Sequence, residues 1–326
     1  MTLHENPELF EQAVLATSQQ LDIPEIYIEK DYWATLALKQ IFESEIKDEV
    51  VFKGGTALSK CHHLIERFSE DIDIVVLKNE GDSNNRLKEK LKKVTNAVNK
   101  VLPEVDHEQT NKKGQIRKTV HPYNKFGFSG EFGQVQENIM VEASWLGSYE
   151  PYTSESVETY IAQMMRNTGQ EQLIEEYGLQ SFEVKVLSKE RTFCEKIMSL
   201  VRFSQTDEPH VDLTKKVRHY YDIHKMLQDD GIVRFFESKE FEAMLNKVGN
   251  DDVESFINNN EWLKIHPKEA IAFKSYKDTW DKIKSAYHGD FEDMVLGDLP
   301  SDNEILESLK QVTERLNQIN WNVKVG

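Results

Sequence analysis

The sequence predicts an α+β protein with a mixed β-sheet in its first part and a helical lobe in its second. Up to about residue 187, short apolar strands are interspersed with amphipathic helices. From Ser188 onward the chain is acidic and has the apolar spacing of successive helices. Since 326 residues suffice for one large or two modest domains, we expect domains 1–187 and 188–326.

Composition excludes several classes of protein. The formal charge of −17 argues against indiscriminate nucleic-acid binding, because Lys and Arg supply most of that affinity. No apolar run approaches the roughly twenty residues of a membrane span, and the first residues lack the pattern of a secretion signal. Cys61 and Cys194 are isolated and suggest no disulfide framework. We therefore expect a cytoplasmic protein without a membrane partner.

The first elements in the chain are two helices. Apolar residues recur at helical spacing over residues 7–20, and Pro24 is typical of the start of a second helix that reaches Phe42. A short apolar strand follows at Val50–Phe52.

The stretch after this strand carries the strongest functional signal. A turn at Gly54-Gly55 leads into a helix expected over 56–66, and a second strand then carries Asp71 and Asp73. Because side chains alternate across a strand, the two aspartates are expected to point the same way while Ile72 and its apolar neighbours point into the core.

Two carboxylates held this close favour a cation between them, since like charges raise each other's proton affinity. Mg²⁺ prefers such oxygen ligands and commonly shares them with substrate phosphates. Gly54 and Gly55 allow close backbone approach, and the helix beginning at Thr56 offers free N–H groups to an anion. The unit therefore predicts a nucleotide and metal site, in which Ser69, two residues before Asp71, shares the same face.

A basic segment follows the acidic strand. A helix is expected over 84–101, and strands are expected over 105–110 and 114–122, before a bend at 126–132. Between Arg86 and Lys118 there are ten basic residues and four acidic ones. This segment is either a solvated surface with ordinary ion pairs or an edge that contacts RNA.

Glu142 is the third carboxylate candidate. Residues 138–146 alternate as a strand with Glu142 among apolar neighbours, and a charged side chain there needs a partner. It is either a third metal ligand or a solvent-facing residue. Residues 154–178 are expected to be helical or loose, and residues 182–187 alternate as one more strand before a helix capped by Ser188.

The sequences GGTALSK and RFSEDIDIVV resemble the nucleotidyltransferase core of the DNA polymerase β-like superfamily, and more narrowly the AbiEii/MenT-type nucleotidyltransferase toxins. Fifteen residues, 56–70, separate the glycines from Asp71, more than is usual in the superfamily, which favours the narrower family. EKDYW at residues 29–33 and RTFCEK at 191–196 resemble further motifs of that family. The likeness extends over 28–33, 52–76 and 190–223.

The resemblance implies a nucleotidyltransferase palm and roles for individual residues. Lys196 is implied to bind the triphosphate, and Asp222, in RHYYDIHKML, to orient Lys196 or contact the nucleotide. An ion pair between Arg218 and Asp222 within their helix is the plainer alternative. Lys30, with its neighbour Asp31, either reaches the nucleotide pocket or forms a surface ion pair. The implied nucleotide-binding residues are Lys30, Lys53, Gly54, Gly55, Thr56, Ser69 and Arg218.

The implied reaction moves an NMP moiety from an NTP to an acceptor hydroxyl, with one or two Mg²⁺ held by Asp71, Asp73 and Glu142. The resemblance further implies a toxin of a toxin–antitoxin or phage-defence system, acting on RNA such as the tRNA acceptor end and countered by a cognate antitoxin. Three alternatives stay open: a nucleotide-binding regulatory protein, an interaction protein of such a complex, and an enzyme with a protein or small-molecule acceptor.

Overall fold

A computed structural model describes residues 1–69, 71–128 and 137–325. It divides into two compact units. The first comprises Met1–His62, Phe68–Trp145 and Tyr152–Leu187, and the second comprises His63–Arg67, Leu146–Pro151 and Ser188–Gly326. Part of the bend expected over 126–132 lies outside the described residues.

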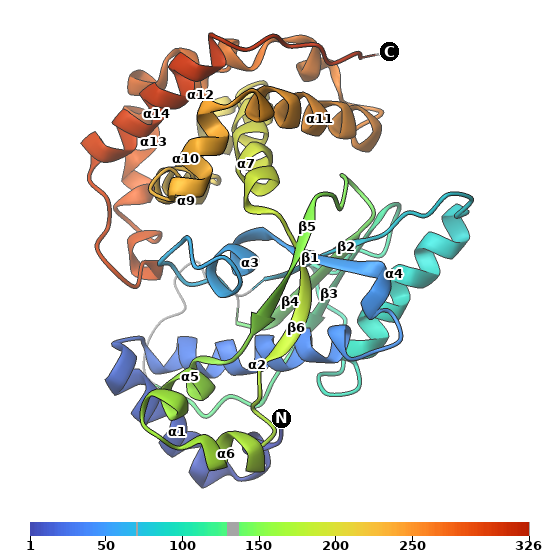
Figure 1. The fold of residues 1–326 in the computed structure, drawn as a ribbon, viewed down its shortest axis with the longest axis vertical. Helices are drawn as coiled ribbons and strands as arrows, with labels where there is room; N and C mark the ends of the chain where they lie inside the picture. The colour runs from blue at the N-terminus through green and yellow to red at the C-terminus, as the bar shows by residue number, and fades with distance from the viewer. Residues whose placement is uncertain (70, 129–136, 326) are drawn as a thin grey trace. The chain divides into compact units, whose positions relative to one another are not determined.

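The first unit is built on a mixed six-stranded sheet with the order β3-β4-β2-β1-β6-β5 (Figure 1). Neighbouring strands are antiparallel except for β1 with β6 and β2 with β4, which are parallel. The strands are β1 (Val50–Lys53), β2 (Ile72–Val76), β3 (Ile116–His121), β4 (Ile139–Ser144), β5 (Tyr152–Val157) and β6 (Phe182–Leu187). The predicted α+β class is confirmed.

Helices cover the sheet and extend the first unit beyond it. α2 and α4 pack against each other and against the strands, while α1, α5 and α6 form a smaller group next to α2 (Figure 1). The helices of this unit are α1 (Pro7–Leu21), α2 (Glu25–Phe42), α3 (Gly54–Lys60), α4 (Asn84–Val98), α5 (Tyr160–Asn167) and α6 (Glu171–Glu176).

The second unit is helical. Its helix α7 packs against α9, α10 and α11, and its core contains the aromatic cluster of Phe193, Phe236 and Phe241. Its helices are α7 (Lys189–Phe203), α8 (Pro209–Thr214), α9 (Val217–Met226), α10 (Asp230–Glu237), α11 (Lys239–Ser255), α12 (Ile271–Lys274), α13 (Tyr276–Tyr287) and α14 (Asp302–Leu316). Ser188 caps α7 as predicted, because its hydroxyl accepts a hydrogen bond from the backbone N–H of Arg191 at 3.2 Å.

Two expected elements around the acidic pair end or begin elsewhere. The helix expected over 56–66 begins at Gly54 and ends at Lys60. Beyond it, His63 adopts a φ of 53°, a left-handed conformation that no helix can continue through. The strand β2 begins at Ile72, so Asp71 precedes the strand and does not lie on it, contrary to prediction.

Two other expectations were wrong. Residues 105–110 form no strand, because only Val105 and Asn111 make isolated bridges to β3 and a turn at His107–Thr110 separates them. The stretch 154–178 includes most of β5, which was not expected. β5 has the polar sequence YTSESV and is largely exposed at the edge of the sheet, so it lacks the apolar alternation that identifies inner strands.

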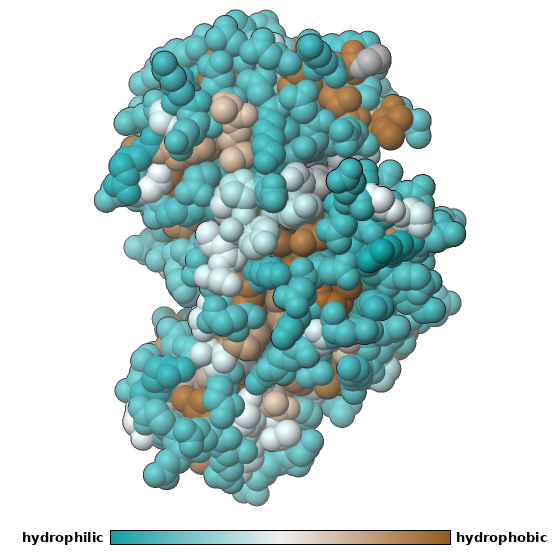
Figure 2. All heavy atoms as spheres, turned by 45° about the vertical axis from the view of Figure 1, so that its right-hand side comes forward, coloured by the Kyte–Doolittle hydropathy of each residue, from teal (hydrophilic) through white to brown (hydrophobic). Residues whose placement is uncertain are grey.

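The face of the protein drawn in Figure 2 is predominantly hydrophilic in both units. Within the described residues, no helix is both long enough and apolar enough to cross a membrane.

Candidate active site

Gly54 lies directly against the carboxylate of Asp73. A Cβ atom at position 54 would approach Oδ2 of Asp73 to 2.1 Å, far inside any normal contact distance. Gly54 also has a φ of +84°, which side-chain-bearing residues rarely adopt. The glycine turn and the acidic strand are therefore side by side, as the sequence predicted.

Asp73 and Glu142 are direct neighbours on adjacent strands. Asp73 of β2 is in register with Glu142 of β4, so both side chains project from the same face of the sheet. Burial, followed by repulsion from Asp71 and Glu142, raises the pKa of Asp73 to about 7. The three carboxylates named from the sequence are thus close enough to influence one another.

A lysine stands at each end of this pair. Lys53 of β1 is in register with Asp73, and Lys118 of β3 is in register with Glu142. The four residues form one cross-strand row on a single sheet face, which we call the charged row: Lys53, Asp73, Glu142 and Lys118. Both lysines partly offset the rise in the pKa of Asp73. Two anionic side chains therefore lie between two cationic ones.

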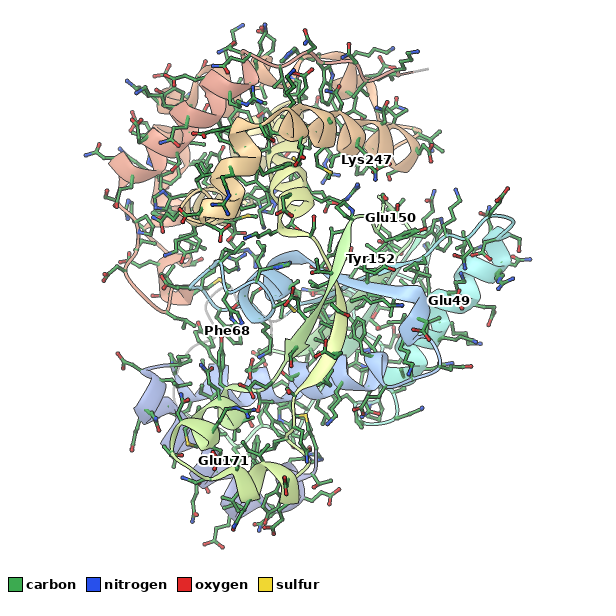
Figure 3. The ribbon with its side chains drawn as sticks, in the orientation of Figure 1. Glu49, Phe68, Glu150, Tyr152, Glu171 and Lys247 are labelled. Atoms are coloured by element: carbon green, nitrogen blue, oxygen red, sulfur yellow. The ribbon has the colours of Figure 1, made fainter. Side chains whose placement is uncertain are left out.

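Hydrogen bonds fix the segment that carries Asp71. The buried hydroxyl of Thr56 donates to the backbone carbonyl of Asp71 at 2.7 Å and lies 3.1 Å from the hydroxyl of Ser69. Phe68, labelled in Figure 3, stacks on Tyr27 of α2 with ring centroids 4.3 Å apart. Thr56 therefore holds Asp71 next to Asp73 even though Asp71 is outside the strand.

The donor set fits a hard divalent cation in its chemistry, because it consists of carboxylate oxygens and a protonated Asp73 would lose its proton to a metal. Within the described residues, no three His, Cys, Asp or Glu side chains are grouped so that they could hold a metal ion. A cation bound by these carboxylates would complete its coordination with water and substrate oxygens, as Mg²⁺ usually does.

The EKDYW motif is buried, so the surface ion pair considered for it is excluded. Lys30 and Asp31 are 0% and 5% exposed, respectively. Asp31 pairs with Lys60 at the end of α3 and accepts a hydrogen bond from the backbone N–H of Tyr160 at 2.9 Å. Asp31 thus connects α2 to α3 and α5, and its carboxylate is occupied by these contacts.

In the second unit, Asp222 binds two cations. Arg67 donates from Nε to Oδ1 at 2.7 Å and from Nη2 to Oδ2 at 2.9 Å, and Lys196 donates to Oδ2 at 2.6 Å. Burial alone would raise the pKa of Asp222, yet Arg67 and Lys196 hold it below its ordinary value. Asp222 contacts Lys196, as one of the two roles considered for it requires. Its partners are these two residues, whereas the intrahelical pair with Arg218 does not form.

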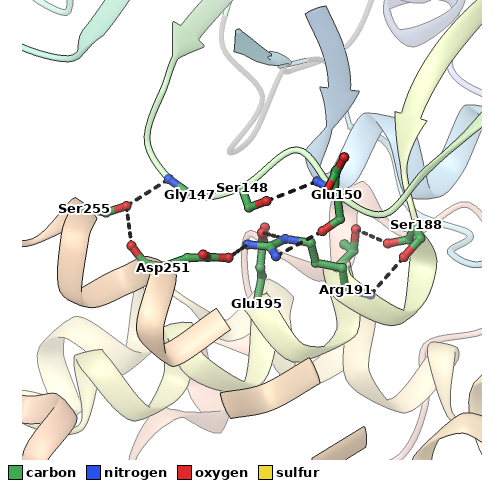
Figure 4. A network of polar contacts seen from close by, with 9 residues as sticks. Gly147, Ser148, Glu150, Ser188, Arg191, Glu195, Asp251 and Ser255 are labelled. Atoms are coloured by element: carbon green, nitrogen blue, oxygen red, sulfur yellow. Dashed lines mark hydrogen bonds and ion pairs between the residues drawn. The ribbon is translucent and has the colours of Figure 1, made fainter. Parts of the chain in front are cut away.

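Arg191, the first residue of the RTFCEK motif, organises a second network (Figure 4). Its buried guanidinium donates to Glu195 at 3.0 Å, to Asp251 at 2.7 Å and to the backbone carbonyl of Glu150 at 3.2 Å. These contacts join α7, α11 and the segment Leu146–Pro151 within the second unit. Arg191 is therefore a structural residue of the helical unit.

Much of the basic segment 86–118 is neutralised by acids. Lys90 is buried and binds Asp82, the carbonyl of Leu77 and Glu49, which Figure 3 labels beside α4. Further pairs are Arg86 with Asp82, Lys93 with Glu45, Lys112 with Glu104 and Arg117 with Glu104. The interpretation of ordinary pairing holds for these residues.

Sequence reasoning missed three cations that contact the motifs it identified. Arg67 is the first residue of RFSEDIDIVV, and Lys60 is the last of GGTALSK, so both were inside quoted motifs. Lys118 was noted only as part of the basic segment. Lys118 shares a strand face with Val120, so it is a charged residue on an otherwise apolar face, as Glu142 is in β4. Two such residues of opposite charge on neighbouring strands are the signal that could have paired them.

Comparison with known proteins gives a family match. Residues 36–314 match the family model described as nucleotidyl transferase AbiEii toxin, type IV TA system. Among solved structures, the chain is similar to MenT4, a nucleotidyltransferase toxin from Mycobacterium tuberculosis, with 12% identity and a TM-score of 0.46 over 92% of this chain and 98% of that chain. No curated protein gives a match. The family match extends over most of the sequence, so this chain belongs to the AbiEii family of nucleotidyltransferase toxins of type IV toxin–antitoxin systems.

Proposed function

We propose that this protein transfers an NMP moiety from an NTP to a hydroxyl group of an RNA acceptor, with Mg²⁺ bound by Asp71, Asp73 and Glu142. The observation that carries the proposal is the charged row beside the glycine turn. Asp73 and Glu142 are neighbours in this row, and the carboxylate of Asp73 lies so close to Gly54 that no side chain would fit at position 54. Family membership supports the reaction class.

Each residue of this unit has a proposed task. Lys53, Gly54, Gly55 and Thr56 lie at one end of the charged row, where they bind the phosphates of the NTP, and Ser69 lines the same site. Asp71, Asp73 and Glu142 would hold the metal, which would neutralise charge at the α-phosphate that is attacked and lower the pKa of the acceptor hydroxyl. Thr56 also holds the Asp71 backbone in place through its 2.7 Å hydrogen bond.

The proposed reaction is balanced as a single displacement. The acceptor oxygen forms a bond to the α-phosphorus of the NTP, the bond between that phosphorus and the α,β-bridging oxygen breaks, and pyrophosphate leaves with the electron pair. The proton of the acceptor hydroxyl passes to water. The chain itself positions the reactants and stabilises negative charge, which is how most phosphoryl-transfer enzymes act.

Lys196, Asp222, Arg218 and Lys30 keep roles that rest on family resemblance. We propose that Lys196 binds the triphosphate and that Asp222 orients it, and the 2.6 Å hydrogen bond between them supports the second part. Arg218 and Lys30 are proposed nucleotide contacts. Lys30 is fully buried, so its ammonium group would contact the nucleotide from the interior of the first unit.

The biological setting is proposed on the same basis. The toxin would act in the cytoplasm on RNA, with the tRNA acceptor end as the preferred candidate, in a toxin–antitoxin or phage-defence system with a cognate antitoxin. The type IV description of the family supports the antitoxin.

The test incubates the purified protein and Mg²⁺ with each labelled NTP, together with total RNA or with a protein extract. We expect label in RNA from wild type. Asp73→Asn should reduce the rate by about three orders of magnitude, because losing one metal carboxylate removes ~4 kcal/mol of transition-state stabilisation.

The matched control is Asp106→Asn, the same chemical change at an exposed residue of the same unit. It should label RNA at the wild-type rate. If wild type labels nothing, or if Asp73→Asn and Asp106→Asn transfer equally well, the proposed reaction is wrong. Label appearing only in protein would retain the transfer reaction and reject RNA as the acceptor.

A further inference from the structure

Lys118 projects from the sheet face opposite to α4. Its neighbour Arg117 donates from Nε to the hydroxyl of Thr95 on α4 at 2.8 Å, so Arg117 points toward that helix. Because successive side chains of a strand point to opposite faces, Lys118 points the other way. This is the face of the charged row, where Lys118 is the cross-strand partner of Glu142.

The ammonium group of Lys118 makes no ion pair or hydrogen bond with the described residues, although the side chain is half-buried beside carboxylates. Lys90, on the neighbouring helix α4, differs in having its charge taken up by Asp82, Glu49 and the carbonyl of Leu77. Lys118 thus keeps its donors available on the face of the proposed active site.

On the side away from Glu142, Lys118 lies at the edge of the sheet. β3 is the last strand of the sheet, so beyond Lys118 there is no further strand. Its backbone exchanges two hydrogen bonds with Asn111, at 2.7 and 3.0 Å, and this fixes the turn that carries Lys112 and Lys113 against the edge of β3. The charge of Lys112 is taken up by Glu104, so Lys113 is the lysine of this turn that adds to the positive charge of Lys118.

We propose that Lys118 binds a backbone phosphate of the nucleic-acid acceptor strand, close to the hydroxyl that receives the NMP. The inference rests on the proposed function and adds which end of the charged row the acceptor occupies. In an in-line displacement, the attacking oxygen and the leaving pyrophosphate lie on opposite sides of the α-phosphorus. With the triphosphate at the end of Lys53 and Gly54, the acceptor approaches from the end of Glu142 and Lys118.

A phosphodiester strand suits this position because it supplies an anion near its terminal hydroxyl. An unmodified protein acceptor has no phosphate that Lys118 could bind. An unpaired lysine at this position therefore offers no advantage for binding a protein acceptor. Each phosphate contacted by a lysine releases counterions, which makes binding depend on salt, with a slope of about −0.7 per contact for a single strand.

The experiment measures binding of fluorescent single-stranded RNA with a free 3′ hydroxyl, by anisotropy in several KCl concentrations and without NTP. Wild type is compared with Lys118→Gln, Lys118→Arg and Lys239→Gln, the last at an exposed lysine of α11 in the second unit. We expect Lys118→Gln to weaken binding roughly tenfold and to reduce the salt slope by about 0.7, whereas Lys118→Arg and Lys239→Gln stay close to wild type.

Two further measurements separate binding from folding and from the NTP site. Thermal midpoints of the four proteins should agree, and the Kd for NTP should be unchanged in Lys118→Gln. In the transfer assay, Lys118→Gln should raise KM for RNA alone, while Lys53→Gln should raise KM for NTP alone.

RNA binding by Lys118→Gln equal to that of Lys239→Gln would overturn the inference, as would a weakened Kd for NTP or transfer to protein alone. If wild type labels RNA and Lys118→Gln does so with unchanged KM, the inference fails while the proposed function stands. If wild type labels nothing, the proposed function fails on its own test.

Discussion

Arg67 and Asp222 form a bidentate ion pair, with Nε to Oδ1 at 2.7 Å and Nη2 to Oδ2 at 2.9 Å. The two residues are 155 positions apart in the sequence, and both are almost fully buried. Because Lys196 also donates to Asp222, one carboxylate binds two buried cations in the helical unit.

The first prediction concerns this carboxylate. Asp222→Asn keeps the shape but removes the anion that pairs with the buried Lys196 and Arg67, so the free energy of unfolding should fall by about 3–5 kcal/mol. Urea denaturation followed by circular dichroism measures it. The control is Asp281→Asn, which removes the partner of the exposed Lys284 and should leave the midpoint almost unchanged. Equal effects of the two variants would show that the buried ion pairs of Asp222 do not stabilise the fold.

The second prediction separates backbone strain from steric contact at Gly54. Gly54→Ala introduces a Cβ where only 2.1 Å separates it from Asp73, so the carboxylate must move. Gly81→Ala is the matched control, because Gly81 has the same φ of +84° and nothing within 4 Å of its Cβ. Both variants should lose about 1 kcal/mol of stability from strain, and Gly54→Ala should lose more because the Asp73 carboxylate is displaced. Gly54→Ala alone should lose transfer activity.

One outcome of this comparison would contradict the prediction. If Gly81→Ala loses as much transfer activity per folded molecule as Gly54→Ala, the contact between Gly54 and Asp73 has no role in the reaction.

The third prediction follows from the pKa of Asp73, which is raised from 3.8 to about 7. Between these values the folded protein holds a proton that the unfolded chain has released, so this group lowers the free energy of unfolding as pH rises. Compared with Asp73→Asn in EDTA, wild type should lose relative stability from pH 5 to pH 8. Thermal denaturation of both proteins across this range is the measurement.

Mg²⁺ should act in the opposite sense. Because the metal needs the deprotonated carboxylate, its stabilisation of wild type should be larger at pH 8 than at pH 6 and weak in Asp73→Asn. Parallel pH profiles for the two proteins, with or without Mg²⁺, would show that Asp73 is not the titrating ligand.

The fourth prediction concerns the EKDYW motif. Asp31→Asn leaves the buried Lys60 without its anion, and we expect a loss of about 3–5 kcal/mol in the free energy of unfolding. Glu43→Gln breaks the i,i+4 pair with Lys39 on the same helix, where Glu43 is 53% exposed, and should cost less than about 0.5 kcal/mol. Urea denaturation measures both values. A loss of stability in Asp31→Asn as small as that in Glu43→Gln would show that the pairing of Asp31 with Lys60 does not stabilise the first unit.

The sequence predicted those parts of the fold that depend on local patterns. The alternation around Glu142 identified β4, and the pair Gly54-Gly55 with Asp73 identified the unit on which the site is built. Ser188 was found as a helix cap because its pattern is local too. In each case the residues that decide the structure are neighbours in the chain.

The sequence did not reveal what depends on distant neighbours or on polar edges. The pairing of Arg67 with Asp222 joins segments far apart in the chain, so no spacing rule finds it. β5 was missed because an edge strand with exposed polar side chains shows no apolar period. The helix that begins at Gly54 ends at Lys60, earlier than the sequence predicts. His63, whose left-handed conformation prevents the helix from continuing, is not a residue type that signals a helix end.

The helical unit is assembled from three separate pieces of the chain, and one of them, His63–Arg67, provides the guanidinium bound to Asp222. A fragment expressed from Ser188 to the C-terminus would lack that piece and also the carbonyl of Glu150 that Arg191 binds. Such a truncation would lack one of the two cations bound to Asp222 and one of the acceptors bound by Arg191. Genetic dissection of this toxin should therefore rely on point substitutions in the intact chain.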